Sequence, residues 1–371
     1  MRVGCPKEIK NHEYRVGLTP ASVREYVAHG HSVLIETNAG AGIGASDADY
    51  VAAGAKIAAT ASEVFQNSDM IVKVKEPQPS EWVQLREGQI LYTYLHLAPD
   101  AEQTKGLLAS GVTGVAYETV TDDRGGLPLL APMSEVAGRL SIQAGAVALQ
   151  KAYGGRGVLL GGVPGVLPGK VVVIGGGVVG LHAANMAVGL GADVTILDRS
   201  LPRLRQLDDI FHGRVHTRFS SIDALESEVF SADLVIGAVL IPGAAAPKLV
   251  TRKMLSGMKK GAVIVDVAID QGGCFETSHA TTHSDPTYEV DGIIHYCVAN
   301  MPGAVPVTSA HALNNATIFH GLALADRGIK AILADKHLRN GLNVHKGKIT
   351  NLPVAEALGL QMHEAESVLA A

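Results

Sequence analysis

Short apolar runs alternate with helical patterns over the first 130 residues of this 371-residue chain. Two of the helical patterns cover residues 19–30 and 99–111, and the first has Pro20 near its start and Gly30 at its end, as helices commonly do. Strands that alternate with helices predict a parallel sheet with helices on both faces. The apolar runs lie within residues 32–37, 69–77, 89–97 and 111–120.

The pattern changes near residue 131. Residues 131–155 predict one long helix, with Ser134 as its N-cap and Gly154 and Gly155 at its end. A loop rich in Gly and Pro follows, and a second series of strands and helices then runs to about residue 305. We therefore predict an α/β protein of two doubly wound, Rossmann-like domains, the second inserted into the first: residues 1–130 with 306–371, and residues 131–305.

The stretch that begins "VVVIGGGVVG" has two possible interpretations. Residues 171–192 contain no Asp, Glu, Lys or Arg, and such a run is long enough to cross a bilayer. However, six glycines interrupt it and no aromatic belt flanks it, unlike a membrane span. Gly175, Gly177 and Gly180 form the spacing GxGxxG between a β-rich run and a helical run, which predicts a dinucleotide-binding turn.

Each glycine has a distinct role in such a turn. Gly175 would allow the tight turn, Gly177 the approach of a pyrophosphate, and Gly180 the close packing of helix on strand. The next apolar run ends at Asp198, where a carboxylate would bind the ribose hydroxyls and repel a 2′-phosphate. We therefore expect NAD rather than NADP, although the neighbouring Arg199 is a residue that a 2′-phosphate would favour.

Composition limits the binding partners, the cellular location and the cysteine chemistry that we expect. The net charge is −5 with no basic block, so neither nucleic acid nor an anionic membrane is an expected partner. The N-terminus "MRVGCPKEIK" carries charges where a signal peptide needs an apolar run, which indicates a cytoplasmic protein. Cys5, Cys274 and Cys297 are far apart in the sequence, so we expect buried thiols rather than a disulfide framework or a CxxC metal site.

Four ionisable residues follow predicted strands, where open α/β sheets bind their ligands. Arg15 lies in the loop after the first strand, Lys75 and His96 each end an apolar run, and Asp270 ends "VIVDVAID". Each also has a simpler explanation. Arg15 could pair with a nearby glutamate at the surface, and Lys75 could be a solvated strand end. His96 could be an ordinary surface or core histidine, and Asp270 could cap a turn.

Together, the four residues fit the chemistry of a small oxo or amino acid. Arg15 and Lys75 would supply cationic donors for a carboxylate or ketone. A histidine such as His96 is suited to transferring a proton near neutral pH, and Asp270 would lie beside the nicotinamide. The set predicts hydride transfer between NAD and the substrate, and no cluster of Cys or His in the sequence indicates a catalytic metal.

Five segments resemble, in order, the signatures of the alanine dehydrogenase and nicotinamide nucleotide transhydrogenase family, and the resemblance extends over essentially the whole chain. It implies NAD-dependent, reversible oxidative deamination of L-alanine to pyruvate and ammonium through an imine that is hydrolysed. It also implies a homo-oligomer, commonly a hexamer. The segments are "PKEIKNHEYRVGLTP" (6–20), "LLAPMSEVAGR" (129–139), "VVVIGGGVVGLHAANMAVGLGADVTILD" (171–198), "VAIDQGGCFE" (267–276) and "CVANMPGAVP" (297–306).

The resemblance also assigns residues and domains. It implies that Arg15 and Lys75 bind the substrate, that His96 and Asp270 are the catalytic pair, and that the inserted domain binds NAD. Arg203 stands where Lys occurs in relatives, which keeps the positive charge. The cofactor positions that it implies, together with those of the glycine turn, are Ser134, Gly175, Gly177, Val178, Val179, Gly180, Asp198, Arg203, Ser220, Val239, Leu240, Val267, Ala268, Ile269, Asp270, Val298, Ala299, Asn300 and Met301.

Three other functions stay open at this point. The chain could be the NAD-binding component of a proton-translocating transhydrogenase, which would not need substrate ions at Arg15, Lys75 and His96. It could act on larger amino acids, as the related saccharopine-forming dehydrogenases do, or it could be a non-catalytic NAD sensor. A sensor would not need His96 or Asp270, and both are present, which favours an enzyme.

Overall fold

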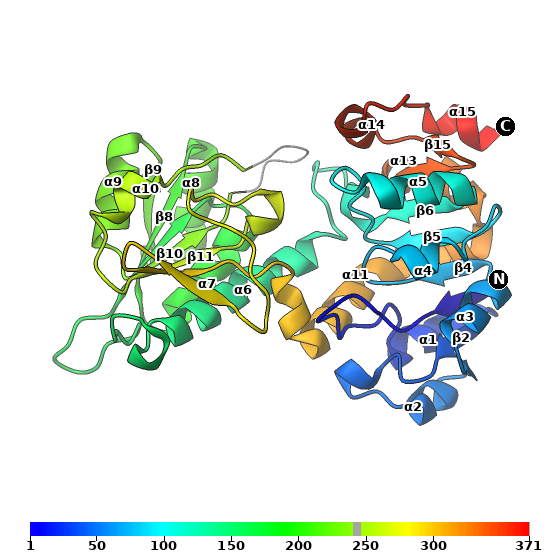
Figure 1. The fold of residues 1–371 in the computed structure, drawn as a ribbon, viewed down its shortest axis with the longest axis horizontal. Helices are drawn as coiled ribbons and strands as arrows, with labels where there is room; N and C mark the ends of the chain where they lie inside the picture. Colours follow the sequence, from blue (N-terminus) through cyan, green and yellow to red (C-terminus); the bar gives the residue numbers. More distant parts are fainter. Residues whose placement is uncertain (240–245, 371) are drawn as a thin grey trace. The chain divides into compact units, whose positions relative to one another are not determined.

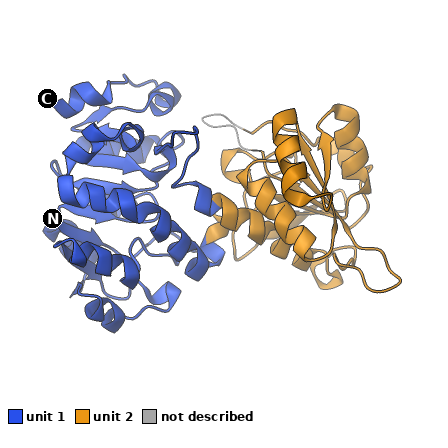
Figure 2. Cartoon of the chain, turned by 180° about the vertical axis from the view of Figure 1, so that it is seen from behind, with its two compact units in different colours: residues 1–133, 303–371 blue, residues 134–302 orange. Residues whose placement is uncertain are grey.

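The computed structural model describes residues 1–239 and 246–370. The chain divides into two compact units, a first unit of Met1–Met133 with Gly303–Ala371 and a second unit of Ser134–Pro302 (Figure 2). The second unit is therefore an insertion in the sequence of the first. Among the residues that the structure describes, no helix is long and apolar enough to span a membrane.

The first unit is built on an eight-stranded sheet (Figure 1). Its strands are β1 (Arg2–Cys5), β2 (Ser32–Glu36), β3 (Lys56–Ala58), β4 (Met70–Val72), β5 (Ile90–Thr93), β6 (Thr113–Ala116), β14 (Leu342–His345) and β15 (Lys348–Ile349). The spatial order is β15-β14-β6-β5-β4-β1-β2-β3. Strands β1 to β6 pair in parallel, whereas β14 and β15 add an antiparallel edge.

Helices cover both faces of this sheet. The return helix α11 packs on α1, and the Tyr92 hydroxyl of β5 donates to the backbone oxygen of Thr317 in α11. On the opposite face, Phe65 of α3 and Leu107 of α5 join the apolar cluster of Ile71 and neighbouring strand residues. The helices are α1 (Pro20–Ala28), α2 (Asp47–Ala52), α3 (Ala61–Asn67), α4 (Pro79–Trp82), α5 (Ala101–Ser110), α11 (Pro306–Arg327), α12 (Ile329–Ala334), α13 (Lys336–Asn340), α14 (Leu352–Leu358) and α15 (Ala365–Ala370), with 3-10 turns η1 (Ala41–Ile43) and η2 (Tyr117–Thr119).

The second unit is built on a seven-stranded sheet in the order β12-β13-β11-β10-β7-β8-β9. All strands are parallel except the edge strand β12. The strands are β7 (Lys170–Ile174), β8 (Asp193–Asp198), β9 (His216–Phe219), β10 (Leu234–Gly237), β11 (Val263–Asp266), β12 (Thr287–Val290) and β13 (Ile293–Tyr296). The helices are α6 (Ala131–Ala148), which begins in the first unit, α7 (Val178–Gly189), α8 (Leu201–Phe211), α9 (Ile222–Ser231) and α10 (Arg252–Leu255), with 3-10 turns η3 (Lys151–Tyr153), η4 (Ile269–Gln271) and η5 (Met301–Ala304).

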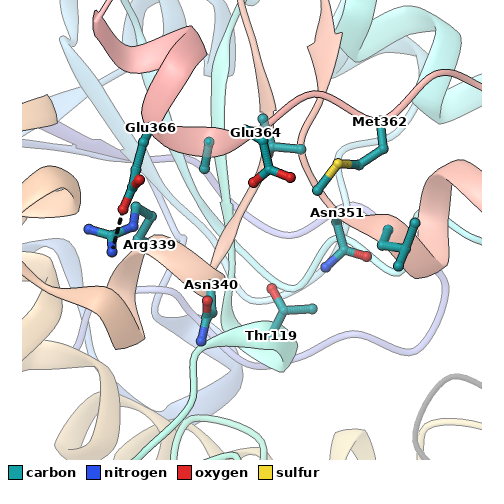
Figure 3. Close-up of a pocket in the computed structure, with 10 residues that line it drawn as sticks. Thr119, Arg339, Asn340, Asn351, Met362, Glu364 and Glu366 are labelled. Atoms are coloured by element: carbon teal, nitrogen blue, oxygen red, sulfur yellow. Dashed lines mark ion pairs between the residues drawn. The ribbon is translucent and has the colours of Figure 1, made fainter.

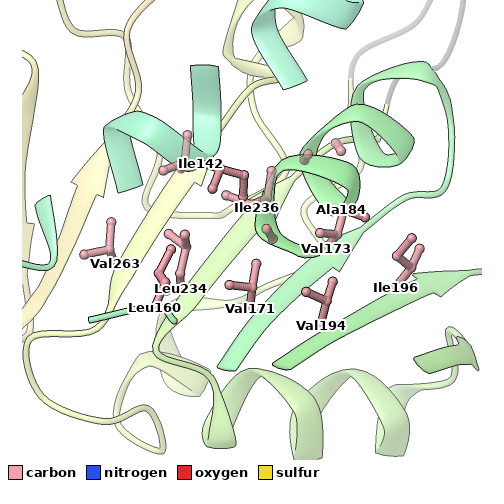
Figure 4. Packing of buried hydrophobic residues seen from close by; sticks show 14 of the residues in the cluster. Ile142, Leu160, Val171, Val173, Ala184, Val194, Ile196, Leu234, Ile236 and Val263 are labelled. Atoms are coloured by element: carbon pink, nitrogen blue, oxygen red, sulfur yellow. The ribbon is translucent and has the colours of Figure 1, made fainter. Parts of the chain in front are cut away.

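Alternate residues of β7 pack into two different cores. Val171 and Val173 join the cluster that includes Ile142 of α6 and Ala184 of α7 (Figure 4). Val172 packs instead with residues of α9 and α10 on the opposite face. Because both faces of the strand are buried, its sequence is continuously apolar. The predicted fold class of two doubly wound, Rossmann-like sheets is thus confirmed, and the apolar run at residue 171 is a strand followed by a 12-residue helix.

Several predicted boundaries were wrong. Helix α6 ends at Ala148 rather than near Gly154, because the chain folds back after Ala148. Gly155 then lies against the end of the helix, where a Cβ would be 2.2 Å from the Ala148 oxygen. Ser134 is not the N-cap, since the helix already begins at Ala131. The runs 69–77 and 89–97 are strands only over Met70–Val72 and Ile90–Thr93. The three cysteines are free and buried, as expected.

Candidate functional site

The carboxyl edge of the second sheet gathers most of the predicted cofactor residues. Strand order reverses on the two sides of β7, because β8 and β9 lie beyond one edge of β7 and β10, β11 and β13 beyond the other. Open α/β sheets bind ligands at such a switch point. The glycine turn directly follows β7 and leads into α7, so it stands at this point of the sheet.

The space available to an added Cβ differs among the three glycines of the turn. Gly175 has φ +103°, and a Cβ there would lie 2.7 Å from the Ala238 oxygen. A Cβ at Gly180 would lie 1.8 Å from the Gly175 oxygen, so α7 sits directly on the turn. Gly177 is the N-cap of α7, has no side-chain cap, and has no neighbouring atom within 4 Å of a Cβ. The helix N-terminus is therefore open to a phosphate, which its N–H groups and dipole favour.

The Asp198 carboxylate at the end of β8 is tied to the same turn. Its Oδ2 accepts the N–H of Gly176 at 2.7 Å, and its Oδ1 accepts the N–H of Ser200 at 2.8 Å. Arg203 donates from Nε to the Gly176 oxygen at 2.6 Å. The backbone N–H of Ser220 donates to the backbone oxygen of Asp198 at 3.0 Å. Asp198 and Arg203 thus contact the glycine turn directly, and Ser220 contacts the backbone of Asp198.

The other predicted cofactor positions follow the ends of β10, β11 and β13. Leu240 lies outside the described residues. Ser134 lies in the first turns of α6 and is half-buried. Asp270 is exposed in the turn η4, four residues beyond β11. The remaining strand-end positions are Val239, Val267, Ala268, Ile269, Val298, Ala299, Asn300 and Met301, while Val178 and Val179 open α7.

Arg15, Lys75 and His96 follow three neighbouring strands of the first sheet. They come after β1, β4 and β5, which lie side by side in the order β5-β4-β1. Strand order again reverses between β1 and β4, so the switch-point rule applies to this sheet as well. Lys75 and His96 each lie three residues beyond their strand rather than at its last residue.

Arg15 is buried and held by a glutamate. Its Nε and Nη2 donate to the two oxygens of Glu13 at 2.7 and 2.6 Å, and its Nη1 lies 3.0 Å from the Met133 sulfur. Burial acts to lower the pKa of Arg15, but the Glu13 carboxylate outweighs it and the pKa is raised. The pairing with a nearby glutamate is therefore real, but it is inside the protein and fixes the guanidinium in a bidentate geometry.

A buried ionic cluster, which the sequence did not reveal, supports the segment that carries Lys75. Lys73 is fully buried, and its Nζ lies 3.1 Å from Glu8 and 2.7 Å from Glu81. Glu8 also accepts the backbone N–H groups of Val74 and Lys75. Burial raises the pKa of Glu8 against the opposing effect of Lys73. The cluster thus anchors the loop after β1 to the segment after β4.

His96 is the most exposed of the three residues, and its backbone is fixed by Glu118. The Glu118 carboxylate accepts the His96 N–H at 2.6 Å, and its Oε1 lies 3.8 Å from His96 Nδ1. The imidazole stacks on Tyr94 with 5.6 Å between ring centroids, and the Tyr94 hydroxyl donates to the Leu129 oxygen. His96 has φ +47°, which few non-glycine residues adopt. Such strain, held by specific contacts, is typical of functional positions.

A cavity of about 370 Å³ lies in the first unit (Figure 3). Thr119 and residues of the C-terminal segment line it, and Arg339 pairs with Glu366 at 2.9 Å across its wall. None of the residues predicted from the sequence lines this cavity. The candidate site is therefore defined by the strand ends and not by this hollow.

Comparison with known proteins gives consistent matches over the full length. The family "Alanine dehydrogenase/PNT" matches through its N-terminal domain at residues 4–137 and its C-terminal domain at residues 141–352. An alanine dehydrogenase of Halomonas elongata is 61% identical over 100% of both chains. A solved L-alanine dehydrogenase is 53% identical with a TM-score of 0.94, covering 97% of this chain and 99% of its own. A transhydrogenase from Sinorhizobium meliloti is 25% identical with a TM-score of 0.83, covering 94% of this chain and 100% of its own.

Proposed function

The chain belongs to the alanine dehydrogenase/PNT family, and on that premise we propose that it catalyses the reversible, NAD-dependent oxidative deamination of L-alanine to pyruvate and ammonium. The observation that carries the proposal is the pair of switch points. One presents a glycine turn with an acidic strand end, and the other presents Arg15, Lys75 and His96 on neighbouring strands. The first unit, approximately residues 1–130 and 306–371, is the substrate domain, and residues 131–305 are the NAD domain.

In the first unit, Arg15 and Lys75 bind the substrate carboxylate and oxo group. Glu13 holds the Arg15 guanidinium in place, while its Nη1 faces the Met133 sulfur, a weak acceptor. A carboxylate that replaces this sulfur contact gains a charge-assisted hydrogen bond. His96, held by Glu118 and Tyr94, transfers protons as the imine forms and is hydrolysed, and Asp270 is the second member of the catalytic pair.

The second unit has a group suited to each part of a dinucleotide. The N-terminus of α7 binds the pyrophosphate, and Asp198 binds the ribose hydroxyls. The residues at the ends of β10, β11 and β13 line the nicotinamide half. NAD held by these residues would supply the hydride acceptor for the substrate carbon. The protein supplies orientation and charge for that transfer, which is the usual division of work in cofactor enzymes.

The function as a transhydrogenase component has less support. The transhydrogenase match is at 25% identity, against 53% and 61% for the alanine dehydrogenases. A component that only binds nucleotide would also have no use for the buried Glu13 clamp on Arg15 or for the strained backbone of His96. The Glu13–Arg15 pair and the positive φ of His96 therefore favour an enzyme that binds a small substrate in the first unit.

Absorbance of NADH tests the proposed function directly. We expect the purified protein to oxidise NADH only when pyruvate and ammonium are both present, and to reduce NAD with L-alanine. Each component is omitted in turn as the control. If NADH binds, as followed by its fluorescence, but no turnover occurs with pyruvate and ammonium, the proposal is wrong and nucleotide binding alone is the function.

Replacing Asp198 with alanine should weaken NAD binding by about 10–100-fold, because hydrogen bonds to charged groups contribute about 1.5–3 kcal/mol. It should also lower the preference for NAD over NADP, since the repulsion of a 2′-phosphate is removed. The measurement is titration of both nucleotides against intrinsic fluorescence. Asp193→Ala, at the opposite end of the same strand, is the matched control and should bind as the wild type does. An unchanged NAD/NADP ratio in Asp198→Ala would remove Asp198 from the ribose role.

We also propose that the enzyme works in the cytoplasm as a homo-oligomer, and specifically as a hexamer. The support is the similarity to alanine dehydrogenases over the full length of the chain.

A further inference from the structure

Two histidines and an aspartate converge on the surface of the first unit, away from the strand ends that carry the candidate site. His29 caps the C-terminus of α1, and His31 stands just before β2. Asp326 is the penultimate residue of α11. One side-chain ligand atom from each of the three lies within 4.8 Å of the other two. From this geometry we propose that the cluster is a binding site for a divalent transition-metal ion of the Zn²⁺ class.

The distances suit such an ion. His31 Nε2 lies 2.8 Å and His29 Nδ1 lies 3.1 Å from the two oxygens of Asp326. Bonds of about 2.0–2.2 Å to nitrogen and oxygen place tetrahedral Zn²⁺ ligands about 3.3 Å apart. Only a small rearrangement of surface side chains is therefore needed. Imidazole with one carboxylate is a donor set that favours Zn²⁺, Co²⁺ or Ni²⁺ over Mg²⁺ or Ca²⁺.

The surroundings hold the rings in a suitable orientation. The side chain of His31 is only 6% exposed, and its other nitrogen, Nδ1, lies 3.1 Å from the amino group of Met1. This contact fixes the ring and directs Nε2 to Asp326. His29 and Asp326 are 44% and 38% exposed, so solvent can supply the fourth ligand and the ion can enter directly.

A metal at this place would join segments that are distant in sequence. The turn between α1 and β2 belongs to the N-terminal part of the chain, whereas α11 begins where the chain returns from the second unit. The two helices already pack on each other, with Gly321 of α11 against Tyr26 of α1. The ion would therefore act as a structural clamp on this packing, because a ligand that binds only the folded state stabilises it.

The test is isothermal titration of the full-length, chelator-treated enzyme with Zn²⁺ alone. We expect one Zn²⁺ per chain at this site and a rise in melting temperature on its addition. His29→Gln and Asp326→Asn should each weaken binding by at least the roughly 10–100-fold that loss of an outer-shell partner costs. Both variants should lose the metal-dependent rise in melting temperature while keeping wild-type turnover without metal, which shows that they fold.

His216→Gln is the matched control, because His216 is exposed and lies 3.6 Å from Asp193 without a second histidine. It should bind Zn²⁺ as the wild type does, and so should His96→Asn, which tests whether the ion goes to the catalytic histidine instead. Absence of Zn²⁺ binding by the wild type would overturn the proposal. So would equal binding by His29→Gln and Asp326→Asn, since the ion would then be held elsewhere.

Discussion

Replacing His96 with asparagine should lower turnover by about 10²-fold or more, the usual contribution of a positioned acid–base group. Asparagine is the informative replacement because His96 has φ +47°, and Asn adopts this left-handed conformation more readily than most residues. The backbone held by Glu118 is thus retained, while the group that transfers protons is lost. Steady-state rates of NADH oxidation with pyruvate and ammonium measure the effect.

Two controls separate chemistry from structure in this variant. NADH affinity should stay at the wild-type value, because the proposed cofactor residues belong to the second unit. The melting temperature should change little, since the His96 side chain is 42% exposed. His96→Ala should lose as much turnover, with some additional strain from its positive φ. Near-normal turnover in His96→Asn would exclude His96 from proton transfer.

Replacing Gly180 with alanine should weaken NADH binding at least tenfold and lower the free energy of unfolding by about 1–3 kcal/mol, the range for overpacked cores. The added Cβ would lie 1.8 Å from the Gly175 oxygen, so α7 must move away from the turn after β7. That movement displaces the N–H groups that are proposed to bind the pyrophosphate. Fluorescence titration with NADH and chemical denaturation measure the two effects.

Gly189→Ala is the matched control in the same helix. A Cβ at Gly189 has no neighbouring atom within 4 Å, and alanine is preferred over glycine in helices by roughly 0.5–1 kcal/mol. This variant should bind NADH normally and be as stable as the wild type or slightly more stable. If Gly180→Ala bound NADH as tightly as Gly189→Ala does, close packing at position 180 would not be what shapes the phosphate site.

The sequence predicts those parts of the fold and candidate site that depend on neighbours along the chain. The glycine turn and Asp198 lie within one strand-helix-strand stretch, so their spacing alone indicates that they meet. The α1 and α5 patterns were also readable, because Pro20 and Gly111 mark their ends. By contrast, β9 has an irregular burial pattern that no alternation of apolar residues reveals.

Contacts between distant segments could not be predicted in this way. The Lys73–Glu8 pair joins residues 65 positions apart, and Glu118 reaches His96 across 22 positions. A charged residue within the apolar run "IVKV" was the available signal for Lys73, since a buried lysine needs carboxylate partners. Nothing in the sequence, however, indicates which of the carboxylates these would be.

The reversal of strand order that occurs in both sheets has a consequence for redesign. At one switch point, the proposed recognition of phosphate uses main-chain N–H groups, which every amino acid possesses. At the other, the proposed recognition of a carboxylate uses the side chains of Arg15 and Lys75, which substitution can change one at a time. Specificity for the oxidisable substrate should therefore be open to stepwise mutation. The phosphate cradle should instead tolerate most changes of side chain and fail abruptly where a Cβ enters the turn.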